Sequence, residues 1–186
     1  GANSHGQLCL GYNSEQQIIP EEIDMTKANI SPSSIVKIVG GGGHTLILTQ
    51  NGNVFACGLN RKGQCSSPVL GILNNLQPID GLKTERIKDI ACGWDSSIAL
   101  TENGEVYTWG SNTYGQLGRK TTLQYSTEPR KIQLNKNIKR IAMGLRHTAL
   151  VTEDGKIMVT GAGNKGQLGI FNENLLPLRQ THIFQT

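Results

Sequence analysis

The glycine-rich stretch from Gly161 to Gly166 is the part of the sequence that most literally matches a cofactor-binding motif. Its letters, GAGNKG, satisfy the G-x-G-x-x-G pattern of dinucleotide-binding loops and follow a strand-like segment. Such a loop also needs a helix directly after it, because the pyrophosphate binds at the helix N-terminus, and no helix-forming segment follows here. The run Gly40–Gly43 lacks the Gly-Lys-Ser/Thr that a P-loop uses to hold phosphates. We therefore expect no nucleotide site and no cofactor in either stretch.

The four cysteines do not form a metal-binding pattern. They stand at positions 9, 57, 65 and 92, with no C-x-x-C pair and no zinc-type spacing. Each occupies a position that an apolar or small residue has elsewhere in the chain, so we expect buried free thiols in a reducing compartment rather than bridges. No paired carboxylates and no nucleophile–base grouping stand out either, so we expect no metal and no covalent catalysis.

The elements that carry these residues repeat along the chain. Segments 35–58, 87–110 and 138–161 share one pattern: an apolar strand, a glycine, then two alternating runs joined by Asn-Gly or Asp-Gly. Such a pair between alternating runs is a strong hairpin signal. A glycine-rich loop also recurs from Gly1, Gly58, Gly110 and Gly161, at intervals of 57, 52 and 51 residues. A period of about 50 residues with strand-like units indicates a propeller, solenoid or array.

The repeat predicts an all-β fold, a β-propeller of four-stranded blades. Three strands of each blade fall in the shared segments, and an outer strand follows the glycine-rich loop near Pro78, Pro129 and Pro177, because proline belongs at a sheet edge. Segment 18–23 resembles such an edge strand, and 24–34 a polar insertion with a helical turn at its start. We expect one partial propeller over 1–186, with repeat units at about 1–57, 58–109, 110–160 and, incomplete, 161–186.

Length and composition agree with this fold class. The chain has 186 residues, 23 of them glycine, with 5% aromatic content, which suits many short strands. A closed propeller of seven such units needs roughly 350 to 370 residues. We therefore expect about three and a half blade equivalents of a longer chain, or self-association through exposed blade faces. The net charge of +4 is spread along the chain without a basic run, so nucleic acid is an unexpected partner and no stretch predicts a membrane span.

The linked motifs resemble the regulator-of-chromosome-condensation repeat family. The loop G-x-N-x-x-G-Q-L-G, the strand followed by Gly-x-x-His-Thr and the Trp-Gly ending recur in one register over nearly the whole chain. Departures are Cys57 and Thr160 in place of the tryptophan, Cys65 in place of the leucine, and Gly163 in place of the loop asparagine. The resemblance implies a seven-bladed β-propeller whose faces bind other proteins.

Within that family, segments 40–45, 57–64, 91–106 and 144–150 look most like a branch linked to protein secretion. This implies guanine nucleotide exchange on a small GTPase, a tie to exocytosis through an exocyst-type partner, and a cytoplasmic location with the nucleus as a second compartment. Two alternatives stay open: a propeller binding module without exchange activity, and an exchange factor that binds chromatin and the GTPase Ran.

Candidate partner-binding residues lie in the short loops after Gly41, Gly93 and Gly144. Trp94 and Asp95 follow Gly93, and Arg146 stands two residues after Gly144, at positions that the repeat does not fix. In the family, acidic and histidine residues of such loops contact the GTPase, which implies roles for Asp95, His44 and His147. The competing interpretation is that the two histidines bond neighbouring backbone; a buried histidine favours that reading and an exposed one favours a partner contact.

Other repeated residues are expected to serve the fold. We expect the glutamine amides of Gln7 and its three counterparts to tie each glycine-rich loop to the adjoining blade. The residues assigned to the repeat itself are Gly41, Gly52, Gly58, Gln64, Gly93, Gly104, Trp109, Gly110, Gln116, Gly144, Gly155, Gly161 and Gln167.

Overall fold

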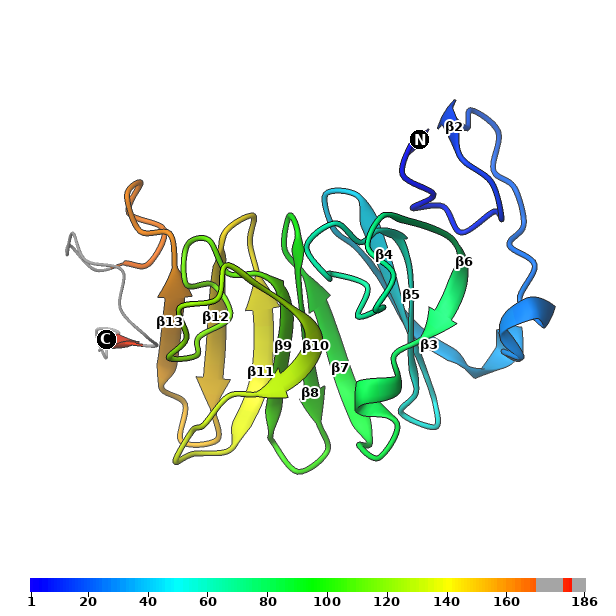
Figure 1. The fold of residues 1–186 in the computed structure, drawn as a ribbon. Helices are drawn as coiled ribbons and strands as arrows, with labels where there is room; N and C mark the ends of the chain where they lie inside the picture. The colour runs from blue at the N-terminus through cyan, green and yellow to red at the C-terminus, as the bar shows by residue number, and fades with distance from the viewer. Residues whose placement is uncertain (170–178, 182–186) are drawn as a thin grey trace.

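Three four-stranded antiparallel sheets form the body of the protein and stand side by side in Figure 1, a computed structural model that describes residues 1–169 and the backbone of 179–181. Within each sheet the strands pair in sequence order. Sheet 1 contains β3 (Ile35–Gly40), β4 (His44–Thr49), β5 (Val54–Leu59) and β6 (Ile72–Pro78). Sheet 2 contains β7 (Ile87–Cys92), β8 (Ser96–Thr101), β9 (Val106–Ser111) and β10 (Tyr125–Lys131). Sheet 3 contains β11 (Ile138–Met143), β12 (His147–Thr152), β13 (Ile157–Gly161) and β14 (Arg179–Thr181).

The predicted all-β fold of four-stranded blades is confirmed. The same register shift occurs at the start of the first hairpin of every sheet, between Ile35 and Lys37 in sheet 1, and between the corresponding residues of sheets 2 and 3. The outer strands β6 and β10 begin about four residues earlier than expected from the positions of their prolines. The reason is that each also pairs with the first residues of the glycine-rich loop that precedes it. Pro177 lies outside the described residues.

Glycines at the hairpin turns meet a backbone requirement. Gly104, between β8 and β9, has a φ of +81°, which L side chains rarely adopt. A Cβ there would also lie 2.7 Å from the Cβ of Asn137, at the entry to sheet 3. The turn glycine therefore shapes its own hairpin and lets the next sheet approach.

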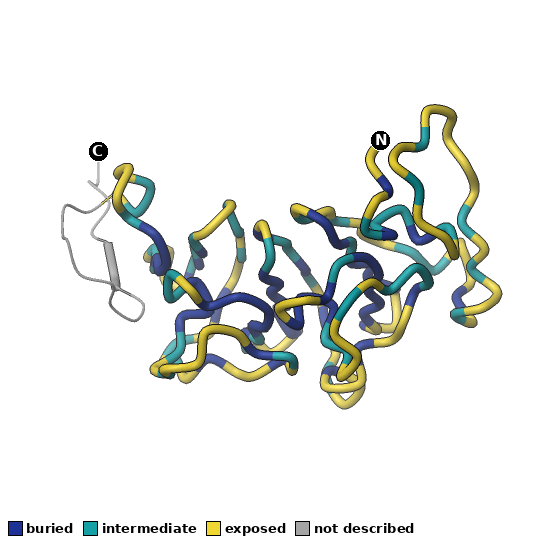
Figure 2. Tube along the Cα trace, turned by 45° about the horizontal axis from the view of Figure 1, so that its top comes forward, coloured by how far each residue is buried: buried dark blue, intermediate teal, exposed yellow. Residues whose placement is uncertain are grey.

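The core lies between neighbouring sheets rather than within one (Figure 2). Between sheets 1 and 2, which we call the first junction, Leu46 and Leu48 of β4 pack against Ile90 of β7 and Trp109 of β9. Between sheets 2 and 3, the second junction, Ile98 and other apolar side chains of sheet 2 pack against sheet 3. Strand residues alternate between the two faces of each sheet, so each sheet contributes to both of its junctions.

The N-terminal segment covers part of the other side of sheet 1. It contains β1 (Ala2–Asn3), β2 (Ser14–Gln16) and the 3-10 turns η1 (Thr26–Ala28) and η2 (Pro32–Ser34); η3 (Asp80–Leu82) lies between sheets 1 and 2. Ile30 packs against Ile47 of β4, so the insertion supplies core side chains. The helical turn expected at its start is η1. The edge strand expected at 18–23 is wrong: Ile18 is 82% exposed, because β1 pairs with β2 and leaves 18–23 no partner strand.

The expectation of four free thiols is also wrong, because Cys9 and Cys57 form a disulfide. Cys57 has the position in sheet 1 that Trp109 has in sheet 2, and Cys9 ends the glycine-rich loop that packs there, with 5.7 Å between the two Cα atoms. The N-terminal loop lies against sheet 1, a contact that the spacing of 48 residues conceals, and this makes the bond possible. Cys65 and Cys92 are free; burial raises the pKa of the Cys65 thiol to about 12 and also raises the pKa of the Cys92 thiol.

Candidate protein-interaction face

Three short loops, 41–43, 93–95 and 144–146, connect the first two strands of sheets 1, 2 and 3. Backbone hydrogen bonds join them in a row: the Gly42 N–H donates to the carbonyl of Trp94 at 2.9 Å, and the Trp94 N–H donates to the carbonyl of Leu145 at 3.1 Å. Each short loop is also bonded to the glycine-rich loop of its own sheet, as when the Ser111 N–H donates to the Asp95 carbonyl at 2.8 Å. We call this side of the molecule the loop face.

Trp94 forms the largest exposed apolar side chain of the loop face. Its indole lies against Gly42, where a Cβ would come within 2.6 Å of the ring atom Cδ2, yet 54% of the residue stays exposed. Leu145, the next residue in the row, is exposed as well. A tryptophan whose ring packs against the protein on one side and is open to solvent on the other has the properties of an anchor at a protein interface.

Asp95 is half-buried beside Trp94. Burial is the main influence and raises the pKa of its carboxyl group, while a hydrogen bond with Ser111 and the charges of Lys62 and Arg146 act in the opposite direction. The charges of Lys62 and Arg146, from the two neighbouring loops, therefore partly offset the free-energy cost of desolvating this carboxylate.

Arg146 is held in place by an aromatic residue of the preceding sheet. Its Nη1 donates to the Tyr114 hydroxyl at 2.8 Å, and the guanidinium lies 4.8 Å from the centre of that ring. Lys62 lies similarly over Tyr125, at 5.8 Å. Such contacts limit the rotamers of long cationic side chains before any partner binds.

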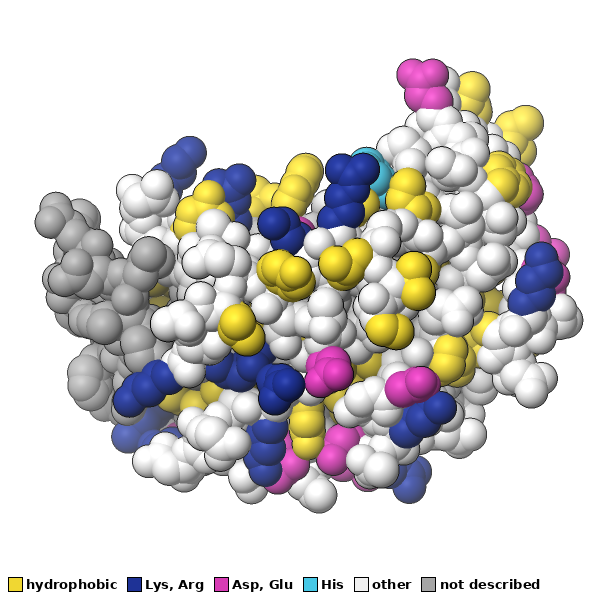
Figure 3. Space-filling view, viewed as in Figure 1, with side chains coloured by type: hydrophobic (Ala, Val, Ile, Leu, Met, Phe, Trp, Pro, Cys, Tyr) yellow, Lys and Arg dark blue, Asp and Glu magenta, His cyan; other side chains and the backbone are white. Residues whose placement is uncertain are grey.

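The charged residues of the loop face are mostly cations. The short loops and glycine-rich loops 58–66, 110–118 and 161–169 carry Arg61, Lys62, Arg146 and Lys165 but a single carboxylate, Asp95. Figure 3 shows Lys and Arg side chains along its upper edge with hydrophobic side chains between them. This pattern favours a partner surface with acidic groups around an apolar pocket.

The structure places the two candidate histidines differently from the exposed residues. His44 is buried, and its Nε2 shares a hydrogen bond of 2.9 Å with the Ser97 hydroxyl of sheet 2. Burial lowers the pKa of His44 to about 4, so the ring is neutral at pH 7. His147 is half-buried, with its ring above Gly144, where a Cβ would come within 2.1 Å of Cε1. His44 therefore acts in the first junction and is not exposed on the loop face.

The repeated glutamines do not act as expected. The amide oxygen of Gln64 accepts from the Lys62 N–H of its own loop at 2.9 Å, and Gln116 and Gln167 make the same contact. The glutamine backbone carbonyl makes the inter-sheet contact instead: that of Gln64 accepts from the Ser97 hydroxyl at 2.8 Å and from Trp109 Nε1 at 2.9 Å. The side chain shapes the loop, and the loop then presents its carbonyl to the next sheet.

Tyr114, Lys62, Tyr125 and Leu145 are loop-face residues that sequence reasoning missed. Tyr114 occupies a loop position where other copies have His5, Lys62 and Lys165, so the repeat leaves it free to vary. That variability is the signal that could have identified it, as it did for Trp94 and Asp95. No group of histidine, cysteine or acidic residues that could hold a metal occurs among the described residues, and none of their helices could span a membrane.

Adjoining four-stranded sheets built from one sequence repeat define a repeat protein of the β-propeller class. A family model described as the Regulator of chromosome condensation (RCC1) repeat matches residues 35–64, 87–116 and 138–167, and a second model with that description matches 51–100 and 103–151. The chain belongs to the RCC1 repeat family.

Several known proteins are similar to this chain. The Secretion-regulating guanine nucleotide exchange factor of Bos taurus is 38% identical over 164 residues, which are 88% of this chain and 34% of that protein. E3 ubiquitin-protein ligase HERC2 of Homo sapiens is 35% identical over 91% of this chain and 4% of its own length. The solved structure of Prp20p from Saccharomyces cerevisiae, described with its binding properties to Gsp1p and histones, has a TM-score of 0.81 at 24% identity and covers 97% of this chain and 45% of that one. The chain spans about a third of its exchange-factor relative.

Proposed function

We propose that this chain is a protein-interaction propeller module that takes part in guanine nucleotide exchange on a small GTPase involved in protein secretion. The observation that carries the proposal is the cluster of Trp94, Asp95, Tyr114 and Arg146 on the loop face. An exchange factor makes no covalent bond; it has to favour the nucleotide-free state of its partner through a rigid surface. Likeness to a relative named as a secretion-regulating exchange factor supports the choice of activity.

Nucleotide release is the direct test. We expect the chain, or a longer natural protein that contains it, to accelerate release of a fluorescent GDP analogue from at least one member of a panel of small GTPases. Trp94→Ala should reduce that acceleration about tenfold or more, the range of an interface anchor. Arg86→Ala, which removes an exposed arginine from the opposite edge, is the control and should leave the rate unchanged.

A binding module without exchange activity is the second candidate. Its support is the similarity to HERC2, a ubiquitin ligase that matches this chain at nearly the same identity as the exchange factor does. If no GTPase in the panel responds, while Trp94→Ala still weakens capture of an exocyst-type partner, this second function replaces the first.

A cytoplasmic location, with the nucleus as a second compartment, stays a prediction. The expectation of a reducing compartment depended on four free thiols, and the Cys9–Cys57 disulfide removes that support.

Self-association would involve the exposed side of sheet 1. Ile38 of β3 is 56% exposed there, whereas its counterpart Ile90 in sheet 2 is fully buried against sheet 1. A second copy of the chain that covered Ile38 would bury the same kind of surface that the first junction buries. Sedimentation velocity over a range of concentrations would test this; a monomer at all concentrations contradicts it.

A further inference from the structure

A cleft opens at the second junction, apart from the loop-face cluster. It has a volume of ≈ 650 Å³, within the range of sites that bind small ligands or a few residues of a peptide. Arg119 and Lys120 line it from the loop that leads into β10, Lys131 from the end of β10, Gln133 and Leu134 from the segment after β10, and Met158 from β13.

The corresponding part of the first junction is filled. There the connection 79–86 forms η3, whose Leu82 is buried, and Tyr107, the counterpart of Met158, packs against the same core cluster. The connection 132–137 is two residues shorter and forms no 3-10 turn. The shorter connection and the smaller, more flexible Met158 side chain thus leave the cleft open.

The lining of the cleft carries excess positive charge. None of its described lining residues is acidic. The half-buried Arg119 donates from Nε and Nη2 to the hydroxyl and carbonyl of Thr108, both at 3.3 Å, and pairs with no carboxylate among the described residues. Burial, followed by repulsion from Arg130, lowers the pKa of Arg119, as expected for a cation without a counter-ion. Lys131 is paired with Glu105, whereas Lys120 has no ion pair among the described residues.

We propose that this cleft binds a short acidic peptide segment of a partner protein. Carboxylates of the segment pair with Arg119 and Lys120, and an apolar side chain between them packs on Leu134 and Met158. The guanidinium of Arg119 offers a planar donor set that suits a carboxylate or a phosphate group. Figure 3 shows Lys and Arg side chains gathered at its lower left, over the end of β10 and the segment that follows it. A peptide fits better than a free anion, because the wall combines cations with aliphatic surface.

The probe is a fluorescein-labelled hexapeptide with the sequence Asp-Glu-Leu-Glu-Glu-Asp, measured by fluorescence anisotropy. We expect saturable binding that weakens as salt is added, and no binding of the Asn/Gln version of the peptide. The double substitution Arg119→Gln, Lys120→Gln should weaken binding about tenfold or more, the cost of losing charge-assisted hydrogen bonds. Lys120→Glu alone should act in the same direction, and because Lys120 is exposed, this variant tests the site even if the double variant folds poorly.

The matched control is the double substitution Lys83→Gln, Arg86→Gln, which removes the same charge from the exposed connection between sheets 1 and 2, outside both the cleft and the loop face. Unchanged affinity in this control supports the cleft; an equal loss in both double variants means general electrostatic attraction and overturns the proposal. Absence of binding below about 1 mM overturns it as well. A phosphoserine version that binds more tightly supports the cleft with phosphate as its anion. Tighter binding of a single-stranded oligonucleotide, with the same dependence on Arg119, overturns the peptide assignment.

Discussion

The first and second junctions use the same backbone contact but fill the space around it differently. At the first junction, the Gln64 carbonyl accepts from Ser97 and from Trp109 Nε1 at 2.8 and 2.9 Å. At the second, the Gln116 carbonyl accepts from the Thr148 hydroxyl at 2.6 Å, and Thr160, in the tryptophan position, donates to the Gly115 carbonyl at 2.9 Å. At both junctions the residue at that position, Trp109 or Thr160, donates to the preceding glycine-rich loop, although the two side chains differ widely in volume.

The outer parts of the two junctions differ in consequence. Tyr107 and Leu82 close the first, and the basic cleft remains at the second. Positions at which the repeat copies have equivalent residues thus build the shared scaffold. Positions at which the copies differ give each junction its own surface. Four measurements test whether the two junctions differ in this way.

Trp109→Ala should have the largest effect. Trp109 is fully buried, and its removal leaves a cavity that the surrounding sheets fill incompletely, so we expect a loss of about 3–5 kcal/mol in the free energy of unfolding. Thr160→Ala, at the matching position of the second junction, should cost only about 1 kcal/mol, the value of one hydrogen bond. Urea unfolding of the chain measures both. Similar losses would mean that the two junctions depend on that position to the same degree.

Reduction of the Cys9–Cys57 disulfide should come next. The bond joins residues 48 apart in the sequence. It attaches the first glycine-rich loop, which ends at Cys9, to Cys57, the residue of sheet 1 that corresponds to Trp109 of sheet 2. We expect reduction to cost about 2–4 kcal/mol, through the greater freedom of the unfolded chain. Unfolding with and without reductant measures this cost. In Cys57→Ser the effect of reductant should disappear; its persistence would assign the effect to other thiols.

His44 should make the first junction sensitive to acid. Its folded pKa of about 4 lies below the ordinary 6.5, so the folded state favours the neutral ring. The resulting stability is complete above pH 6.5 and is lost as the pH falls towards 4, by about 2 kcal/mol between pH 7 and pH 5. His44→Ser, which copies Ser96 of sheet 2, should flatten the pH dependence of unfolding over that range. An unchanged slope would show that another group titrates.

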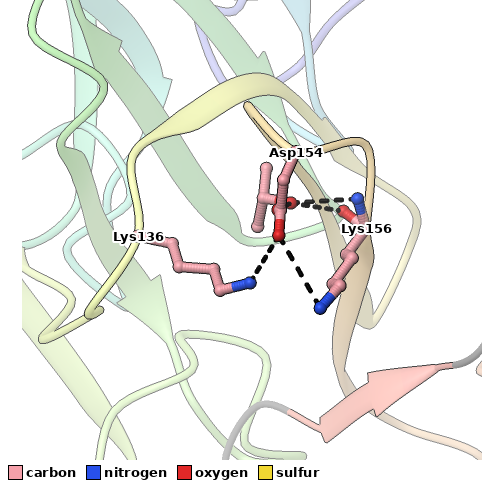
Figure 4. A network of polar contacts seen from close by, with 4 residues as sticks. Lys136, Asp154 and Lys156 are labelled. Atoms are coloured by element: carbon pink, nitrogen blue, oxygen red, sulfur yellow. Dashed lines mark hydrogen bonds and ion pairs between the residues drawn. The ribbon is translucent and has the colours of Figure 1, made fainter.

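The ion pair of Asp154 should have the smallest effect. Lys136, in the connection into sheet 3, lies 2.6 Å from Asp154, and Lys156 lies 3.7 Å away (Figure 4). The hydrogen bond with Lys136, followed by that with Thr152, lowers the pKa of Asp154 to about 2. The contribution is therefore present above about pH 4 and is lost as the pH falls through 2.

Because the pair is exposed, Asp154→Asn should lower the melting temperature at pH 7 by no more than about 2 °C. Glu102→Gln removes the exposed ion pair with Arg86 at the first junction and should have an effect of similar size. At pH 2 the difference between Asp154→Asn and the unaltered chain should be smaller than at pH 7. A difference that stays constant between pH 7 and pH 2 would assign the effect to hydrogen bonding rather than charge.

The candidate site was predictable in part. Comparing the copies picked out Trp94 and Asp95, because a residue that differs from its counterparts is not required by the repeat. The same comparison placed Arg146 but could not reveal that Tyr114 holds it, since the two side chains belong to different sheets. His44 and His147 look alike in sequence, yet His44 is fully buried between two sheets and His147 only half-buried.

The strands, their turns, the blade-like sheets and the family could be predicted from the sequence, because these depend on residues close together within each copy. Alternation, turn glycines and a period of about 50 residues are local signals, and they recur three times. The tertiary structure decided the pairing of Cys9 with Cys57, the role of the glutamine carbonyl and the cleft lined by Arg119. Each depends on how a loop of one repeat copy packs against a strand of the next. Residues that meet in this way are far apart in the sequence, so their spacing does not reveal the contact.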